Sequence, residues 1–80
     1  MNNNKTFKVL FKNARYLGLP DNEKTFLFKP GINIQNLLEG NDICFKRQGV
    51  SFVIEGHLEK SSYVLKDGDE IRVIPIIVGG

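Results

Sequence analysis

The chain has 80 residues, of which 41% are hydrophobic, and a formal net charge of +2; this length and composition predict one domain with one compact core. Eleven basic and nine acidic residues give too weak and scattered a positive charge for a nucleic-acid-binding protein, because phosphate binding needs a clustered basic face. One cysteine and one histidine exclude a disulfide framework and a zinc site. No apolar run reaches the roughly 18 residues that cross a membrane, and no signal peptide follows Met1, so we expect a cytoplasmic protein.

The first part of the chain is expected to form two strands. Between residues 6 and 12, phenylalanine and valine alternate with lysine, which is typical of a half-buried strand. Residues 23–29 are rich in strand-forming side chains and predict a second strand. The connection over residues 13–22 contains Gly18 and Pro20, which favour a loop. Because the two strands are neighbours in the sequence, the simplest pairing is an antiparallel hairpin with a long loop.

A helix is expected next. From Ile34 onwards, three apolar residues at i, i+3 and i+4 share one helical face. Asn33 is suited to cap the N-terminus of this helix. Gly40 either caps its C-terminus, which gives about two turns, or lies inside a longer helix that continues towards Arg47. The sequence leaves both lengths open.

The second half of the chain contains strand and turn signals only. Residues 50–54 predict a third strand, Glu55 and Gly56 a turn, and residues 57–58 a short strand. Asp67-Gly68-Asp69 is a turn signal that precedes a last β-branched strand, and this strand must end, or run at a sheet edge, at Pro75. The carboxylates of the turn are expected to be solvated.

The order of these elements predicts an α+β fold in two layers, with a mixed sheet of four to five strands packed on one main helix. If the last strand is inserted at the centre of the sheet, the topology is a β-grasp, or ubiquitin-like, fold. We expect a single domain over residues 1–80 with flexible segments at 1–5 and about 76–80. Cys44, between Ile43 and Phe45, is expected in the core and His57 on the surface. Five phenylalanines are also expected in the core: Phe7, Phe11, Phe26, Phe28 and Phe52.

The end of the chain, LKDGDEIRVIPIIVGG from Leu65 to Gly80, carries a resemblance to a known family. It is similar to the C-terminus of the ThiS/MoaD sulfur carriers, which include the thiamine-biosynthesis carrier and the small subunit of molybdopterin synthase. Their pattern is Leu-x-Asp-Gly-Asp-Glu, an apolar strand, Pro, and a terminal Gly-Gly. The matching residues are Leu65, Asp67, Gly68, Asp69, Glu70, Pro75, Gly79 and Gly80. The opening residues 8–15 resemble the molybdopterin subunit, whereas the length of the middle segment is nearer to the thiamine carrier.

The resemblance implies a carrier without a catalytic site and without a bound cofactor, monomeric on its own. Its Gly80 carboxylate would be adenylated by a partner that resembles a ubiquitin-activating enzyme and uses ATP and Mg²⁺. The resulting thiocarboxylate would pass its sulfur to a synthase subunit. Glycines suit such a tail, because a backbone without side chains can thread a narrow tunnel. The residues expected to contact partners are Arg72, Pro75, Ile76, Ile77 and Val78, with Lys46 and Arg47 adding charge steering.

Two other functions compete with this interpretation. A ubiquitin-like modifier would form isopeptide bonds through Gly80. Phage tail-assembly proteins contain a similar ubiquitin-like domain that acts as an interaction module, but they continue beyond it, whereas we expect this chain to end at Gly80.

Overall fold

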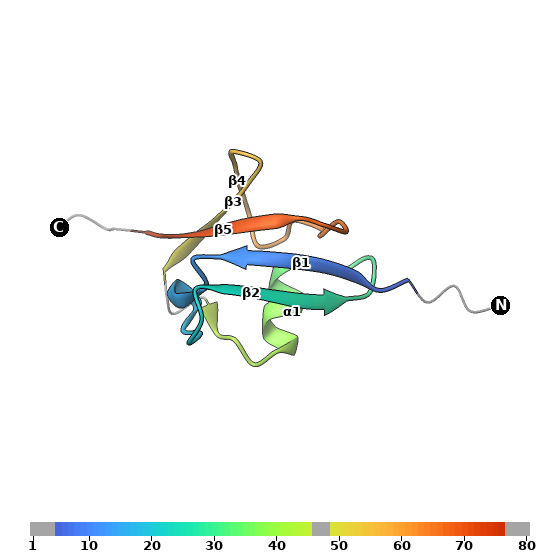
Figure 1. Cartoon of the computed structure of the whole chain (residues 1–80). Helices are drawn as coiled ribbons and strands as arrows, with labels where there is room; N and C mark the ends of the chain where they lie inside the picture. The colour runs from blue at the N-terminus through green and yellow to red at the C-terminus, as the bar shows by residue number, and fades with distance from the viewer. Residues whose placement is uncertain (1–4, 46–48, 77–80) are drawn as a thin grey trace.

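The computed structural model describes residues 5–45 and 49–76 as a five-stranded sheet with one α-helix packed against it (Figure 1). The elements in chain order are β1 (Phe7–Lys12), the 3-10 helix η1 (Ala14–Leu17), β2 (Glu23–Phe28), α1 (Ile34–Gly40), β3 (Val50–Ile54), β4 (His57–Glu59) and β5 (Glu70–Pro75). The strand order in the sheet is β2-β1-β5-β3-β4. The sheet is mixed, and the predicted α+β architecture with a β-grasp arrangement is confirmed.

The first two strands form the expected antiparallel hairpin, in which Phe7 pairs with Phe28 and Lys12 with Glu23. Their connection contains η1, which begins after Asn13 and ends before Gly18. Both of these flanking residues have positive φ, 59° and 85°, a region that asparagine and glycine tolerate better than other residues. This connection lies at the same end of the molecule as the end of β5 (Figure 1).

The last strand lies at the centre of the sheet. β5 is parallel to β1, with Leu10 opposite Glu70, and antiparallel to β3, with Val50 opposite Pro75. Pro75 is the last residue of β5, as predicted from its missing N–H. One further bond holds the chain beyond it, because the Ile76 N–H donates to the Gly49 carbonyl at 2.6 Å.

The core lies between one face of the sheet and α1. Its six largest fully buried side chains are Phe11, Ile34, Leu38, Ile71, Val9 and Val73. The expected phenylalanine core is confirmed, because four of the five named phenylalanines are buried and Phe7 packs against them partly buried. Edge-to-face contacts join Phe11 to Phe26 and Phe45 to Phe52, each at 5.5 Å between ring centroids, a geometry that aromatic pairs favour.

The helix has the shorter of the two predicted lengths. The Asn36 N–H donates to the side-chain oxygen of Asn33 at 2.7 Å, which confirms the N-cap. α1 includes Gly40 and ends there, and Asn41 takes the C-cap position. The amide of Asn41 also donates to the Leu37 carbonyl at 2.8 Å, so a polar side chain satisfies one of the last helical carbonyls.

The prediction that Cys44 belongs to the core is wrong, because its side chain is exposed. Its neighbours Ile43 and Phe45 are both buried, at 7% and 6% exposure. Ile43 and Cys44 lie in neither a helix nor a strand, and in such an irregular segment neighbouring side chains can point in opposite directions. The two apolar neighbours therefore turn inward while Cys44 faces solvent. The prediction that His57 lies on the surface is confirmed.

Candidate functional site: β5 and the outer face of the sheet

β5 divides its side chains between the core and the outer face of the sheet. Ile71 and Val73 point inward and have no exposed area. Alternation along a strand places Arg72, Ile74 and Ile76 on the opposite side. The exposed fractions of Ile74 and Ile76 are 38% and 52%. β5 and Ile76, the residue that follows it, therefore present a cationic and two apolar side chains on the face that α1 does not cover.

The neighbouring strands extend this face sideways. Arg72 lies opposite Lys12 of β1 and opposite Val53 of β3. Val53 in turn lies opposite Leu58 of β4, whose side chain is 73% exposed. We call the set Arg72, Val53, Leu58, Ile74 and Ile76 the outer-face patch. It joins apolar surface to one guanidinium and continues along β5 towards the end of the chain.

The Asp67-Gly68-Asp69 turn fixes the start of β5 against β1. Asp67 Oδ1 accepts a hydrogen bond from the Lys8 N–H at 3.0 Å, and the Gly68 N–H donates to the Lys8 carbonyl at 2.8 Å. The Leu10 N–H then donates to the Asp69 carbonyl at 3.0 Å. Gly68 has a φ of 85°, which explains why a glycine is needed at the centre of this turn.

The side chain of Asp69 closes the turn from the other side. Its Oδ2 atom accepts hydrogen bonds from the Tyr63 hydroxyl at 3.1 Å and from the Lys66 N–H at 2.8 Å. Partial burial, together with this hydrogen bond and the nearby negative charge, raises the pKa of Tyr63 to about 12. The expectation that the carboxylates of the turn are merely solvated is therefore wrong: Asp67 and Asp69 both hold backbone N–H groups.

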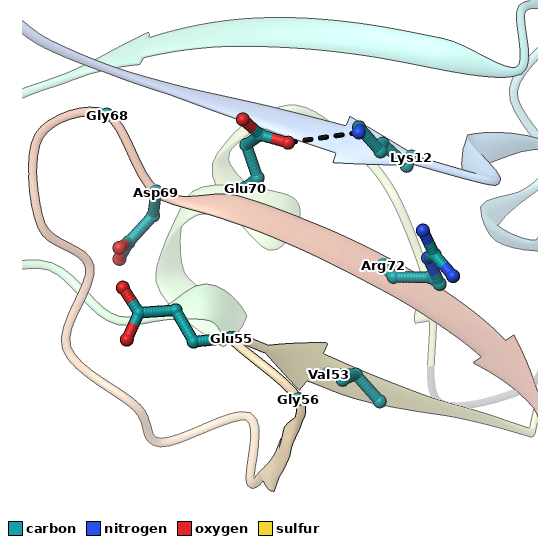
Figure 2. A pocket seen from close by; sticks show the side chains of 8 residues that line it. All are labelled: Lys12, Val53, Glu55, Gly56, Gly68, Asp69, Glu70 and Arg72. Atoms are coloured by element: carbon teal, nitrogen blue, oxygen red, sulfur yellow. Dashed lines mark ion pairs between the residues drawn. The ribbon is translucent and has the colours of Figure 1, made fainter.

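Beside this turn, the outer face contains a shallow, open hollow (Figure 2). Its lining residues are Lys12, Val53, Glu55, Gly56, Gly68, Asp69, Glu70 and Arg72. Two of these residues, Lys12 and Glu70, form an ion pair at one side of the hollow, with 3.0 Å between Nζ and Oε1. Within residues 5–45 and 49–76 there is no cluster of three or more histidine, cysteine or acidic side chains that could hold a metal ion.

The structure describes three of the residues predicted to contact partners, and they lie on one strand and its continuation: Arg72, Pro75 and Ile76. The other predicted positions, Lys46, Arg47, Ile77, Val78, Gly79 and Gly80, fall outside the described residues. Ile74 was not among the predicted contact residues, although its two-residue spacing from Arg72 and Ile76 was a sufficient signal. Val53 and Leu58 were not predicted either, because their place beside Arg72 depends on strand order and register.

These features define a β-grasp protein whose central strand leads directly into the C-terminal residues. The ThiS family model matches residues 10–80, and the chain belongs to this family. Proteins of the ThiS family are sulfur carriers that are not themselves enzymes and bind no cofactor, and their chemistry involves an activating enzyme as partner. A comparison with curated proteins found no significant match. The part of the chain that the structure describes has no helix long and apolar enough to cross a bilayer.

Proposed function

We propose that the reacting group of this sulfur carrier is the carboxylate of Gly80. An activating enzyme adenylates it with ATP and Mg²⁺, and a sulfur donor then converts it into a thiocarboxylate. The thiocarboxylate supplies sulfur to a synthase subunit that makes molybdopterin or the thiazole of thiamine. The observation that carries the proposal is the family match, which runs through β5 and includes Gly79 and Gly80.

The chemistry explains why a partner is needed. A carboxylate is a poor electrophile at neutral pH, so one of its oxygens first attacks the α-phosphorus of ATP and pyrophosphate leaves. Hydrosulfide from the sulfur donor then attacks the carbonyl carbon of the acyl-adenylate; the new C–S bond replaces the C–O bond to AMP, AMP leaves, and loss of the S–H proton gives the thiocarboxylate. Glycine at position 80 has no side chain to crowd that carbon. All groups that stabilise these steps belong to the partner, which fits a chain that acts as a substrate.

The folded surface supports this role energetically. Fixing the tail in an active site costs about 1–2 kcal/mol per residue in backbone entropy, and contacts elsewhere must offset this cost. Ile76 is half exposed, and Arg72 and Ile74 lie on the same face of β5. We propose that Arg72, Pro75 and Ile76 contact the partner and that Ile77 and Val78 continue the contact into the active site.

The test is to incubate the purified carrier with ATP, Mg²⁺, an activating enzyme of its own organism and a sulfur source. Intact-mass spectrometry first verifies that the starting protein ends at Gly80. The expected product is heavier by about 16 Da, because sulfur replaces one oxygen. The matched control lacks Gly79 and Gly80 and should show neither pyrophosphate release nor the mass gain. A full-length carrier that gains no mass under these conditions would contradict the proposal.

Two further readouts separate the pathways and the competing functions. The thiocarboxylated carrier is offered to a thiazole synthase and to the large subunit of molybdopterin synthase, and the one that consumes it identifies the pathway. A modifier would instead add its whole mass to lysines of other proteins. An interaction module would bind its partners equally well after deletion of the two glycines.

A further inference from the structure

The one charged side chain within the outer-face patch is Arg72, and its surroundings differ from those of the neighbouring cation Lys12. On β2, the residue opposite Lys12 is the acidic Glu23. Lys12 also forms the 3.0 Å ion pair with Glu70. Lys12 is therefore flanked by acidic groups of its own chain, one of which it binds directly.

Arg72 has no such partner among the described residues. Across the sheet it lies opposite Lys12 on one side and Val53 on the other. Along the same face of β5, its neighbours are Glu70, which binds Lys12, and the apolar Ile74. Figure 2 shows its guanidinium well apart from the carboxylates of Glu55 and Asp69. The cations Lys12 and Arg72 thus lie side by side on the adjacent strands β1 and β5, and the ion pair with Glu70 neutralises Lys12 but not Arg72.

We propose that the activating enzyme recognises this carrier through Arg72, which binds a carboxylate set in an apolar surface of that enzyme. This inference rests on the function proposed above and adds the chemistry of the partner. The apolar members of the outer-face patch exclude water around the guanidinium when they are covered, and such desolvation strengthens a charge pair. Arginine suits the position, because its planar fork binds a carboxylate through two parallel hydrogen bonds.

The position of Arg72 on β5 links this contact to the reaction. Ile74 and Ile76 continue the same face from Arg72 towards residues 77–80. A partner surface that binds Arg72 therefore also lies beside Ile74 and Ile76, the residues of this face that precede the tail. The charge pair at Arg72 strengthens binding of the carrier, and the adjoining apolar contact orients β5, the strand that precedes the tail.

The test compares Arg72→Glu with Lys8→Glu in the adenylation assay. Lys8 lies on the same outer face of β1, four residues before Lys12 and away from the patch, and both replacements change the net charge equally. Carrier concentration is varied to separate KM from kcat. Arg72→Glu should raise KM for the carrier about tenfold, the effect of losing one partly desolvated charge pair. Its kcat should stay within about twofold, because Arg72 touches no reacting atom.

Lys8→Glu should leave both constants within about twofold of the wild type, because exposed charges away from the contact are screened. Arg72→Gln serves as a second variant that adds no acidic group beside Glu70, and it should raise KM in the same direction by a smaller factor. Raising the salt concentration should increase KM of the wild type more than that of Arg72→Glu. Circular dichroism verifies that each variant is folded.

Three results would overturn the proposal: unchanged KM in both Arg72 variants, equal increases for Arg72→Glu and Lys8→Glu, or a loss confined to kcat. An equal increase would mean that the enzyme senses only net charge. A wild-type carrier that is not adenylated at all refutes the proposed function, and the role of Arg72 fails with it. Normal adenylation of the wild type with no effect at Arg72 refutes this inference alone.

Discussion

The hydrogen bond between Tyr63 and Asp69 is expected to stabilise the fold, because it holds the turn before β5 in place. Tyr63→Phe removes the hydroxyl and leaves the ring in place, so it deletes the 3.1 Å bond to Asp69 Oδ2. A hydrogen bond to a charged acceptor contributes about 1.5–3 kcal/mol when well shielded. Tyr63 is only partly buried, and solvent screening lowers the expected loss to about 1 kcal/mol. In a domain of this size, such a loss lowers Tm by about 4–8 °C.

The stabilisation by this hydrogen bond is expected to be lost at alkaline pH. The pKa of Tyr63 is raised from 10.0 to about 12 in the folded protein, so the folded state keeps its proton over a range where the unfolded chain has lost it. The stabilisation is fully present below pH 10 and is lost as the pH rises through about 12. The difference in unfolding free energy between wild type and Tyr63→Phe should therefore be constant below pH 10 and vanish towards pH 12.

Urea titrations of both proteins from pH 7 to pH 12 measure this difference, and taking the difference cancels every pH effect that the two proteins share. Asp69→Asn provides a double-mutant cycle, because asparagine keeps one acceptor oxygen but loses the charge. The losses of unfolding free energy in the two single variants should add up to more than the loss in the double variant. If the difference between wild type and Tyr63→Phe does not change with pH, and if the losses of the two single variants are additive, the hydrogen bond between Tyr63 and Asp69 does not contribute to stability as proposed.

Three further predictions concern other parts of the fold. Ile71→Ala should lower the free energy of unfolding, measured in urea, by about 2–5 kcal/mol, because Ile71 is fully buried in the central strand. This is a large part of the roughly 4–12 kcal/mol expected for 80 residues. A loss below about 1 kcal/mol would contradict this packing. Asn33→Ala should lower the unfolding free energy by about 0.5–2 kcal/mol, because the Asn36 N–H loses its acceptor; an unchanged thermal midpoint would speak against the cap. Cys44→Ser should change stability by less than about 0.5 kcal/mol, since the side chain is exposed, whereas a core position would show a larger loss.

Most of the fold followed from local patterns in the sequence. The alternation in residues 6–12 and the β-branched run from Val50 to Ile54 each predicted a strand, because one face of each is buried. Glu55 and Gly56 were expected as a turn, and both adopt positive φ, 51° and 79°, as a tight two-residue hairpin requires. The centre of the sheet was predicted for β5 only through the resemblance of the tail, since strand content alone does not determine strand order.

The details of the site depended on contacts that local patterns do not contain. The bond between Tyr63 and Asp69 is determined by the path of the loop before β5, and no periodicity specifies that path. Cys44 was misplaced because its neighbours' burial says nothing of its own direction once the helix has ended. The surroundings of Arg72 require the registers of β5 with β1 and with β3 together, and these depend on the complete sheet.

The central place of β5 determines when the sheet can be completed during synthesis of the chain. Among the strands that the structure describes, the two hairpins (β1 with β2, and β3 with β4) do not pair with each other, and β5 joins them. Because the middle strand lies so late in the sequence, the halves of the sheet cannot be united until residues 70–75 have been synthesised. A chain cut short before that point lacks the buried Ile71 and Val73 and exposes the apolar faces they cover. Such a chain also lacks Gly80, the residue at which we propose that sulfur is carried, so the strand that completes the sheet and the proposed reacting group are lost together.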